Sequence, residues 1–348
     1  MADEAPQIDK PRRIRWYRCR LTRQDLSLLN KRSNLKGFAQ TLSFLGLLAA
    51  TGGLAVWSAA HWPWYVTVLV TFLHGTCCYF LINGFHELVH ESVFRTRWLN
   101  GFFLRILAFL GWHNHHWFWA SHTEHHKYTL HDPDDLEVVL PMKVTLWDFL
   151  RRGFVDPHRF IHGVVGQFRR ALGNYNPNRE VWTSQLFPAE NVQGRRKLIR
   201  WARILLIGHG LIVGTALALG WWMVPVVVTL TPAYGRWLQF LCNESQHMGL
   251  QDKVPDFRLC CRTIYLNPLL RFFYWNMNYH TEHHMYAAVP FHSLPALHRA
   301  VAHDFPVPQK SFTAALRLLG EIGRRQASDP AYVHSPEFPP TAAPPKRR

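Results

Sequence analysis

Residues 62–90 read WPWYVTVLVTFLHGTCCYFLINGFHELVH, and this stretch decides the fold. Residues 62–85 contain no Asp, Glu, Lys or Arg, and about 20 apolar residues are enough for a helix to cross roughly 30 Å of hydrocarbon. The stretch ends on His86-Glu-Leu-Val-His90, whose two histidines are four residues apart and so share one helix face. We therefore predict a membrane helix that carries two imidazoles at its end.

Two further segments are apolar enough to cross a membrane. Residues 37–60 carry no charged side chain, and the only charged residue between Ile204 and Asn243 is Arg236, whose long stem lets its guanidinium reach the interface. A turn near Gly220 divides the second segment into two spans. The sequence therefore predicts an all-α integral membrane protein with a helical cap and four transmembrane helices in two hairpins, at about 37–60, 62–85, 201–220 and 221–242.

The distribution of basic residues predicts the orientation. The formal net charge of the 348 residues is +16, but no Lys or Arg lies between Lys36 and Arg95, or between Arg203 and Arg236. The positive-inside rule then places both termini and the 86–203 loop in the cytoplasm. This is the inner membrane in a bacterium, or the endoplasmic reticulum membrane in a eukaryote. Because the basic residues flank apolar runs, we expect them to face an anionic membrane surface and expect no nucleic-acid partner.

The chain divides into three parts. Residues 1–36 are polar and basic, which predicts a cytoplasmic interfacial segment and no cleavable signal peptide. Residues 37–305 hold the apolar segments and the histidine motifs. Residues 306–348 form a proline-containing tail that we expect to be partly disordered. Between the hairpins, the apolar run from Gly101 to Trp112 is too short to span, so it predicts an interfacial helix.

Two more histidine motifs repeat one spacing. They are His122-Thr-Glu-His125-His126 and His280-Thr-Glu-His283-His284, each with histidines at positions i, i+3 and i+4 of a helix. The predicted topology places all three motifs in the cytoplasmic part of the chain. Eight imidazoles on one side of a membrane indicate a cluster of transition-metal ions, of which Zn, Cu, Fe and Ni suit imidazole.

Other interpretations of these motifs explain less. The first motif alone fits the H-E-x-x-H pattern of zinc proteases, but that interpretation leaves both pentads without a role. A metal transporter or metal store usually carries its ligands within the spans or in loose histidine tracts. His247, in Asn243-Glu-Ser-Gln-His247, is either an interfacial histidine or a ninth ligand. In the second case, Asn243 on the same helix face holds a metal-bound water.

The full pattern resembles the membrane fatty acid desaturase superfamily, which includes related hydroxylases and oxygenases. The resemblance covers roughly residues 35–305, and the Asn243/His247 pair is similar to the N-x-x-x-H element of stearoyl-CoA desaturases. The three-residue spacer of the first motif is typical of acyl-lipid desaturases and hydroxylases. The run from Asn267 to His298 is similar to the rhizopine-oxygenase-like bacterial group, with sphingolipid desaturases as more distant relatives.

The resemblance implies a non-haem di-iron centre with O2 as co-substrate and nine histidine ligands. These are His86, His90, His122, His125, His126, His247, His280, His283 and His284. It also implies a membrane-bound oxidoreductase that desaturates a lipid or acyl chain. Hydroxylation by a ferredoxin-dependent oxygenase of the same superfamily is the first alternative. A metal-binding membrane protein without catalysis is the second.

Metal-bound imidazoles need partners for their other ring nitrogen. We predict Asn243, Asp132 and Asp135 around the metal ligands, and Asp134, Glu87, Glu124 and Glu282 are further candidates. The histidines at 113, 115 and 116 are expected to line the surface or a substrate channel.

The chain has no nucleotide-binding glycine loop and no cysteine set for an iron–sulfur cluster. A separate electron donor is therefore needed: a Rieske-type ferredoxin, another ferredoxin, or cytochrome b5 with a reductase. Its expected docking face is basic and carries Arg151, Arg152, Arg195, Arg196 and Lys197.

Overall fold

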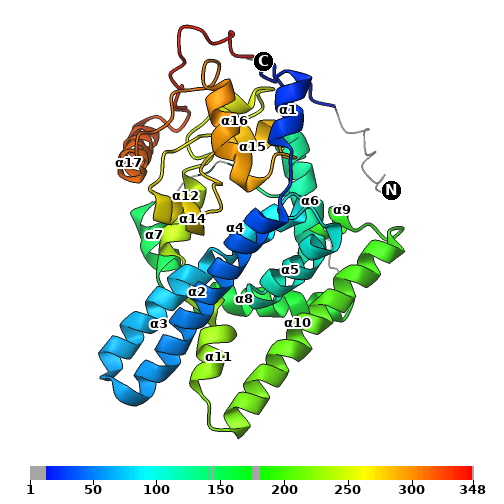
Figure 1. Cartoon of the computed structure of the whole chain (residues 1–348), viewed down its shortest axis with the longest axis vertical. Coiled ribbons are helices and arrows are strands. Elements are labelled where there is room, and N and C mark those ends of the chain that lie inside the picture. The colour runs from blue at the N-terminus through cyan, green and yellow to red at the C-terminus, as the bar shows by residue number, and fades with distance from the viewer. Residues whose placement is uncertain (1–12, 141, 143–144, 175–180, 347–348) are drawn as a thin grey trace, which may run out of the picture.

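Long apolar helices lie at one end of the molecule and a cap of shorter helices at the other (Figure 1). The computed structural model describes residues 13–140, 142, 145–174 and 181–346. Within these ranges the regular structure is helical, and β-pairing is limited to isolated bridges such as Val155 with Tyr234. The predicted all-α class is therefore confirmed.

Among the described residues, three helices are long and apolar enough to cross a membrane. They are Asn34–His61 (α2), Trp64–Val89 (α3, Trp64–Tyr79, continued by α4, Leu81–Val89) and Val192–Ala218 (α10). The hydroxyl of Ser33 caps α2 by accepting a hydrogen bond from the Lys36 amide. Pro63 separates α2 from α3, because proline fits the start of a helix but not its interior. The two helices then pack side by side (Figure 1).

The expected fourth span, 221–242, is not a continuous helix. The segment instead contains α11 (Met223–Val228), a 3-10 turn η1 (Thr231–Ala233) and α12 (Trp237–Glu244). Pro232 has no amide hydrogen to extend a helix. Gly235 has a φ of +83°, and a Cβ atom there would lie 2.4 Å from the Thr76 amide nitrogen. A turn packed closely against α3 therefore interrupts this segment, and a continuous fourth membrane helix is not confirmed.

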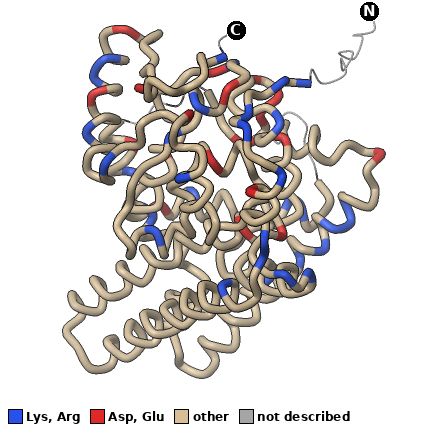
Figure 2. Tube along the Cα trace, turned by 45° about the horizontal axis from the view of Figure 1, so that its top comes forward, with Lys and Arg blue, Asp and Glu red and all other residues tan. Residues whose placement is uncertain are grey.

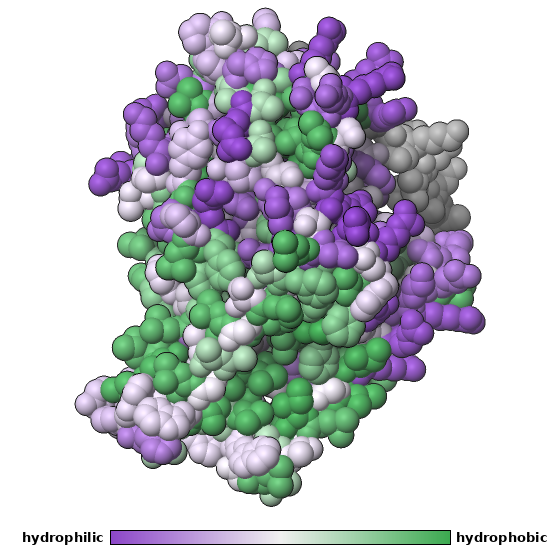
Figure 3. All heavy atoms as spheres, viewed as in Figure 1, coloured by the Kyte–Doolittle hydropathy of each residue, from purple (hydrophilic) through white to green (hydrophobic). Residues whose placement is uncertain are grey.

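The apolar end exposes large hydrophobic side chains, as a surface in contact with lipid would. Val68 and Leu69 on α3 and Ile207 and Leu211 on α10 are all exposed. Figure 3 shows this end as a largely hydrophobic band below a hydrophilic cap. In Figure 2 the Lys and Arg residues lie on the cap and beside it, away from the tip of the α2–α3 pair. This separation supports a membrane protein, while the side of the membrane that the cap faces stays a prediction.

The cap surrounds the C-terminal end of α4 and the N-terminal end of α10. The helix α5 (Arg97–Leu110) covers most of the predicted interfacial segment, Gly101 to Trp112, and its Trp98 and Phe102 side chains are exposed. A buried aromatic and aliphatic core that includes Phe85, Leu107 and Trp275 joins α4 and α5 to the C-terminal half of the cap. The remaining helices are α1 (Arg23–Leu29), α6 (His115–Tyr128), α7 (Leu146–Gly153), α8 (Pro157–Ala171), α9 (Val181–Leu186), α13 (Phe257–Cys260), α14 (Pro268–Phe273), α15 (His280–Met285), η2 (Phe291–Ser293), α16 (Leu294–Val301) and α17 (Phe312–Ser328).

The C-terminal segment, for which we expected partial disorder, lies against the cap in the structure. Residues 312–328 form α17, and the chain beyond it returns to the cap (Figure 1). The His334 amide donates to the Gly249 carbonyl at 2.7 Å, and the buried Arg258 guanidinium donates to the Ala343 carbonyl at 3.2 Å. Residues 1–12 of the predicted N-terminal segment and residues 347–348 of the tail lie outside the described residues.

Candidate metal centre

One group of five histidines comes from three helices. His86 lies on α4 and His90 caps its end, so the four-residue spacing aims both imidazoles from one face. His122 and His126 repeat that spacing on α6, and His283 comes from α15. One nitrogen of each of the five lies within 4.8 Å of the others. The Nε2 atoms of His90 and His122 are 3.1 Å apart, and those of His122 and His126 are 3.0 Å apart.

A second group lies beside the first. His247, His280, His284 and Cys261 each place one nitrogen or sulfur atom within 4.8 Å of the others. The Nε2 atoms of His247 and His280 are 2.8 Å apart, and those of His280 and His284 are 3.0 Å apart. The ring of His284 is 4.5 Å from that of His126, measured between centroids, so the two groups adjoin.

His125 borders the second group. Its ring centroid is 4.9 Å from that of His284 and 5.4 Å from that of His247. All nine predicted histidines are therefore in or beside the two groups. Cys261 was not among the predicted residues, because adjacent cysteines without C-x-x-C spacing give no metal signal in sequence.

The spacing of the nitrogen atoms fits metal ligation. Two imidazole nitrogens bound to one metal ion at about 2.1 Å and at right angles lie about 3.0 Å apart. The Nε2–Nε2 distances within the groups are 2.8 to 3.2 Å. Burial lowers the pKa of His247 to about 3, and burial with the neighbouring His86 lowers that of His90 to about 3. These imidazoles are therefore neutral near pH 7, as metal ligands must be.

The opposite ring nitrogen of four histidines has an oxygen partner. Each contact fixes the tautomer and turns Nε2 toward its group, as is common at metal sites. The Nδ1 partners are the Glu137 carboxylate for His122 (2.7 Å), the Asp135 carboxylate for His125 (2.9 Å), the Cys260 carbonyl for His247 (2.8 Å) and the Thr129 hydroxyl for His284 (3.2 Å).

The two aspartates that we predicted near the metal ligands differ in position. Asp135 is buried, and it also accepts the Leu130 amide at 2.8 Å, so its carboxylate is held in place. Asp132 is exposed to solvent and contacts none of the nine histidines within the described part of the chain. Asp132 lies in the exposed turn that precedes Asp135, so its carboxylate is not placed to orient a metal ligand.

The other acidic candidates also divide. Oε1 of the buried Glu87 lies 3.4 Å from His86 Nδ1 and 3.9 Å from His283 Nδ1, so this carboxylate is close to the first group. Glu282 instead contacts His298, and Glu124 pairs with Lys127 on the surface. Glu137 was not among the candidates, because its place beside His122 depends on the loop path and not on a helical spacing.

A cavity of about 120 Å³, here called the inner cavity, borders both groups. Its lining includes His86 and His122 of the first group and His247 and His280 of the second. Asn243 also lines it, and its side-chain amide has no hydrogen-bond partner among the described residues. The inner cavity therefore provides space for a small molecule next to both histidine groups.

Comparison with known proteins agrees with this geometry. A family model described as fatty acid desaturase matches residues 60–314. A stretch of 93 residues is 30% identical to the sphingolipid delta(4)-desaturase of Komagataella phaffii, covering 26% of this chain and 24% of that protein. The match thus spans about a quarter of the relative's length. The rhizopine-oxygenase-like branch stays a prediction.

Proposed function

The chain belongs to the fatty acid desaturase family, and from this premise we propose that it is a membrane-bound, di-iron, O2-dependent desaturase of a lipid or acyl chain. The family makes the chain an oxidoreductase. The relative named as a sphingolipid desaturase supports a lipid substrate. The presence of two irons, the use of O2 and the formation of a double bond are the proposed steps beyond the family.

The observation that carries the proposal is the pair of adjoining histidine groups. His86, His90, His122, His126 and His283 would hold one iron. His125, His247, His280 and His284 would hold the other. Bound iron would supply, with O2 and external electrons, the oxidising power to remove hydrogen from an unactivated C–H bond.

The other residues of the centre would orient the metal-binding imidazoles and position a water molecule. Asp135 and Glu137 fix the rings of His125 and His122 through Nδ1. The side-chain amide of Asn243, which has no hydrogen-bond partner among the described residues, lines the inner cavity, where it would position a water molecule. The cavity walls would then fix which C–H bond lies within reacting distance, and this placement decides the product.

Electrons would come from a separate ferredoxin, or from cytochrome b5 with its reductase. The five basic residues expected to form its docking face do not form one patch. Arg151 and Arg152 lie on α7, while the other three lie at the start of α10, and Figure 1 shows these elements on opposite sides of the cap. A single donor would therefore bind one of these sites and not both.

Mass spectrometry of lipids from cells with and without the gene tests the proposal. Desaturation predicts a product that has lost two hydrogen atoms. A product that has gained one oxygen atom would instead establish the hydroxylase alternative. Purified protein that consumes no O2 with a donor system and lipid extract would favour a metal-binding protein without catalysis.

A further inference from the structure

We propose that a second cavity, adjoining the metal centre, binds an amphiphilic substrate by its anionic head group, a carboxylate or phosphate, through Arg159 and Arg236. This inference rests on the proposed function for the identity of the reacting centre. Its first basis is the continuity of two cavities. The second one, here called the outer cavity, has a volume of about 370 Å³ and lies between α3, α8, η1 and α12.

The inner and outer cavities share part of their lining. Ile82, Glu137, Gln239 and Asn243 line both. The inner cavity continues to the histidines of both groups, whereas the outer cavity continues to Arg159 and Arg236. A molecule that fills both would therefore have one end at the metal centre and the other at two cations.

One face of α12 connects the two ends. Arg236, Gln239 and Asn243 stand at positions i, i+3 and i+7, so they share a face of this helix and its cap. At a rise of 1.5 Å per residue, Arg236 and Asn243 are separated by about 10 Å along the axis. A ligand with its anion at Arg236 would thus need a spacer on the order of 10 Å before its reacting carbon.

Neither guanidinium has an ionic partner within the chain that the structure describes. Arg159 forms no ion pair, and the nearby Asp156 carboxylate caps α8 by accepting the Arg159 backbone amide at 2.9 Å. The guanidinium of Arg236 packs over the Phe240 ring with its Cζ 4.5 Å from the centroid. The charges of Glu244 and Asp156 reach Arg236, but neither carboxylate forms an ion pair with it.

The positive charges of Arg159 and Arg236 are not balanced by a paired carboxylate among the described residues. Burial, together with the like charge of Arg159, lowers the pKa of Arg236 to about 10. A half-buried cation beside a second cation is costly unless an anion accompanies it. Arginine is also the side chain best suited to bind a carboxylate or phosphate through two parallel hydrogen bonds. Glu137 also lines the outer cavity, but among the described residues no carboxylate forms an ion pair with Arg159 or Arg236. The outer cavity therefore offers two cations to an anionic ligand.

The surroundings explain why the ligand would be an amphiphile. On α8, Ile161, Val165 and Phe168 are exposed and follow a helical spacing, which indicates an interfacial helix. The outer cavity also has apolar walls, including Trp112 and Phe160, whose rings pack edge to face at 5.6 Å. An apolar chain moving from the bilayer surface along α8 would find both a lining for its stem and cations for its head.

The test is a binding competition that needs no turnover. The metal-loaded protein in zwitterionic lipid discs would be titrated with spin-labelled stearate, and the immobilised fraction followed by electron paramagnetic resonance. Hexadecanoate, hexadecyl phosphate and hexadecan-1-ol would then compete for the site. We expect at least one of the two anions to displace the probe about tenfold or more better than the alcohol, as charge-assisted hydrogen bonds predict. The relative strength of the two anions identifies the head group.

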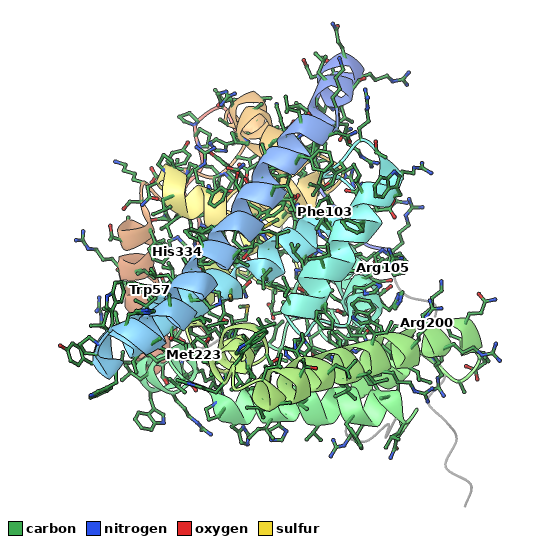
Figure 4. All side chains as sticks on the ribbon, turned by 60° about the horizontal axis from the view of Figure 1, so that its bottom comes forward. Trp57, Phe103, Arg105, Arg200, Met223 and His334 are labelled. Atoms are coloured by element: carbon green, nitrogen blue, oxygen red, sulfur yellow. The ribbon has the colours of Figure 1, made fainter. Side chains whose placement is uncertain are left out.

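Variants assign the effect to the two arginines. The double variant Arg236→Gln, Arg159→Gln should lose the preference for the anion over the alcohol. The single variant Arg236→Lys, with Arg159 intact, should keep part of that preference. Arg200→Gln is the matched control, since Arg200 is exposed at the outer end of α10, away from Met223 at the start of α11 (Figure 4). Unchanged iron content would show that the variants are folded.

Three results would overturn the inference: equal competition by the alcohol, no immobilised probe at all, or an anion preference that survives loss of both arginines. Because the assay measures binding and not turnover, failure of this inference can be distinguished from failure of the proposed function. A chain that binds the anion through both arginines but forms no double bond would refute desaturation and leave the head-group site in place.

Discussion

His125 differs from the other motif histidines in its electrostatic surroundings. Burial opposes its protonation, but the Asp135 carboxylate at Nδ1 outweighs this effect and raises the pKa of His125. In the neutral imidazole that metal ligation requires, this contact holds the remaining proton on Nδ1, so Nε2 carries none and can face the second group. Asp135 itself is fixed by the Leu130 and Glu137 amides. The buried carboxylate of Asp135 therefore orients the imidazole of His125, the one motif histidine that borders the two groups without belonging to either.

Replacing Asp135 should weaken metal binding without changing any ligand. Asp135→Asn keeps the shape but loses the charge at His125 Nδ1, and loss of such a partner typically costs 10–100-fold in metal affinity or activity. Iron content after dialysis against a chelator would measure the loss. Asp132→Asn is the matched control, because Asp132 is exposed and should leave iron content unchanged. Equal iron retention by both variants would refute the role of Asp135.

At the scale of elements, helical spacing predicted which histidines of one motif share a helix face, but it did not predict the contacts between motifs. The i, i+3 and i+4 positions predicted that each motif shares a face, and the helices α4, α6 and α15 have that form. The contacts of Cys261 and Glu137 depend on the path of loops outside the motif helices, which helical spacing does not encode. The fourth predicted span is not a continuous helix, because hydropathy averages over Pro232 and Gly235, whereas the backbone at these positions determines the turn.

The turn at Gly235 should therefore be sensitive to a single methyl group. Gly235→Ala adds a Cβ at positive φ, 2.4 Å from a backbone nitrogen of α3, and such backbone strain alone costs about 1–3 kcal/mol. We expect a lower unfolding temperature of the purified protein in detergent. Gly210→Ala, in open space on α10, should leave that temperature unchanged or slightly raised, since alanine favours helix. Equal unfolding temperatures for the two variants would contradict the strain.

At the scale of the whole molecule, the cap and the metal centre lie at one end of the three candidate membrane helices, and the Trp57–Trp64 tip lies at the other. The positive-inside rule predicts that the cap faces the cytoplasm. This predicted orientation would also give a cytoplasmic electron donor access to the centre.

Labelling of single introduced cysteines would test the orientation. Arg324→Cys on α17 and His61→Cys at the tip are both exposed positions, while five of the six native cysteines are buried. In sealed inside-out vesicles, an impermeant maleimide should label the first variant and not the second. The reverse pattern would invert the predicted topology.

The iron content of the purified protein tests the central claim most directly. Two adjoining histidine groups predict about two irons per chain, bound by imidazole ligands. His283→Ala and His280→Ala, one from each group, should each lower that content, while the exposed surface variant His158→Ala should not. A single zinc ion per chain, or iron binding that is unaffected by both changes, would contradict the account.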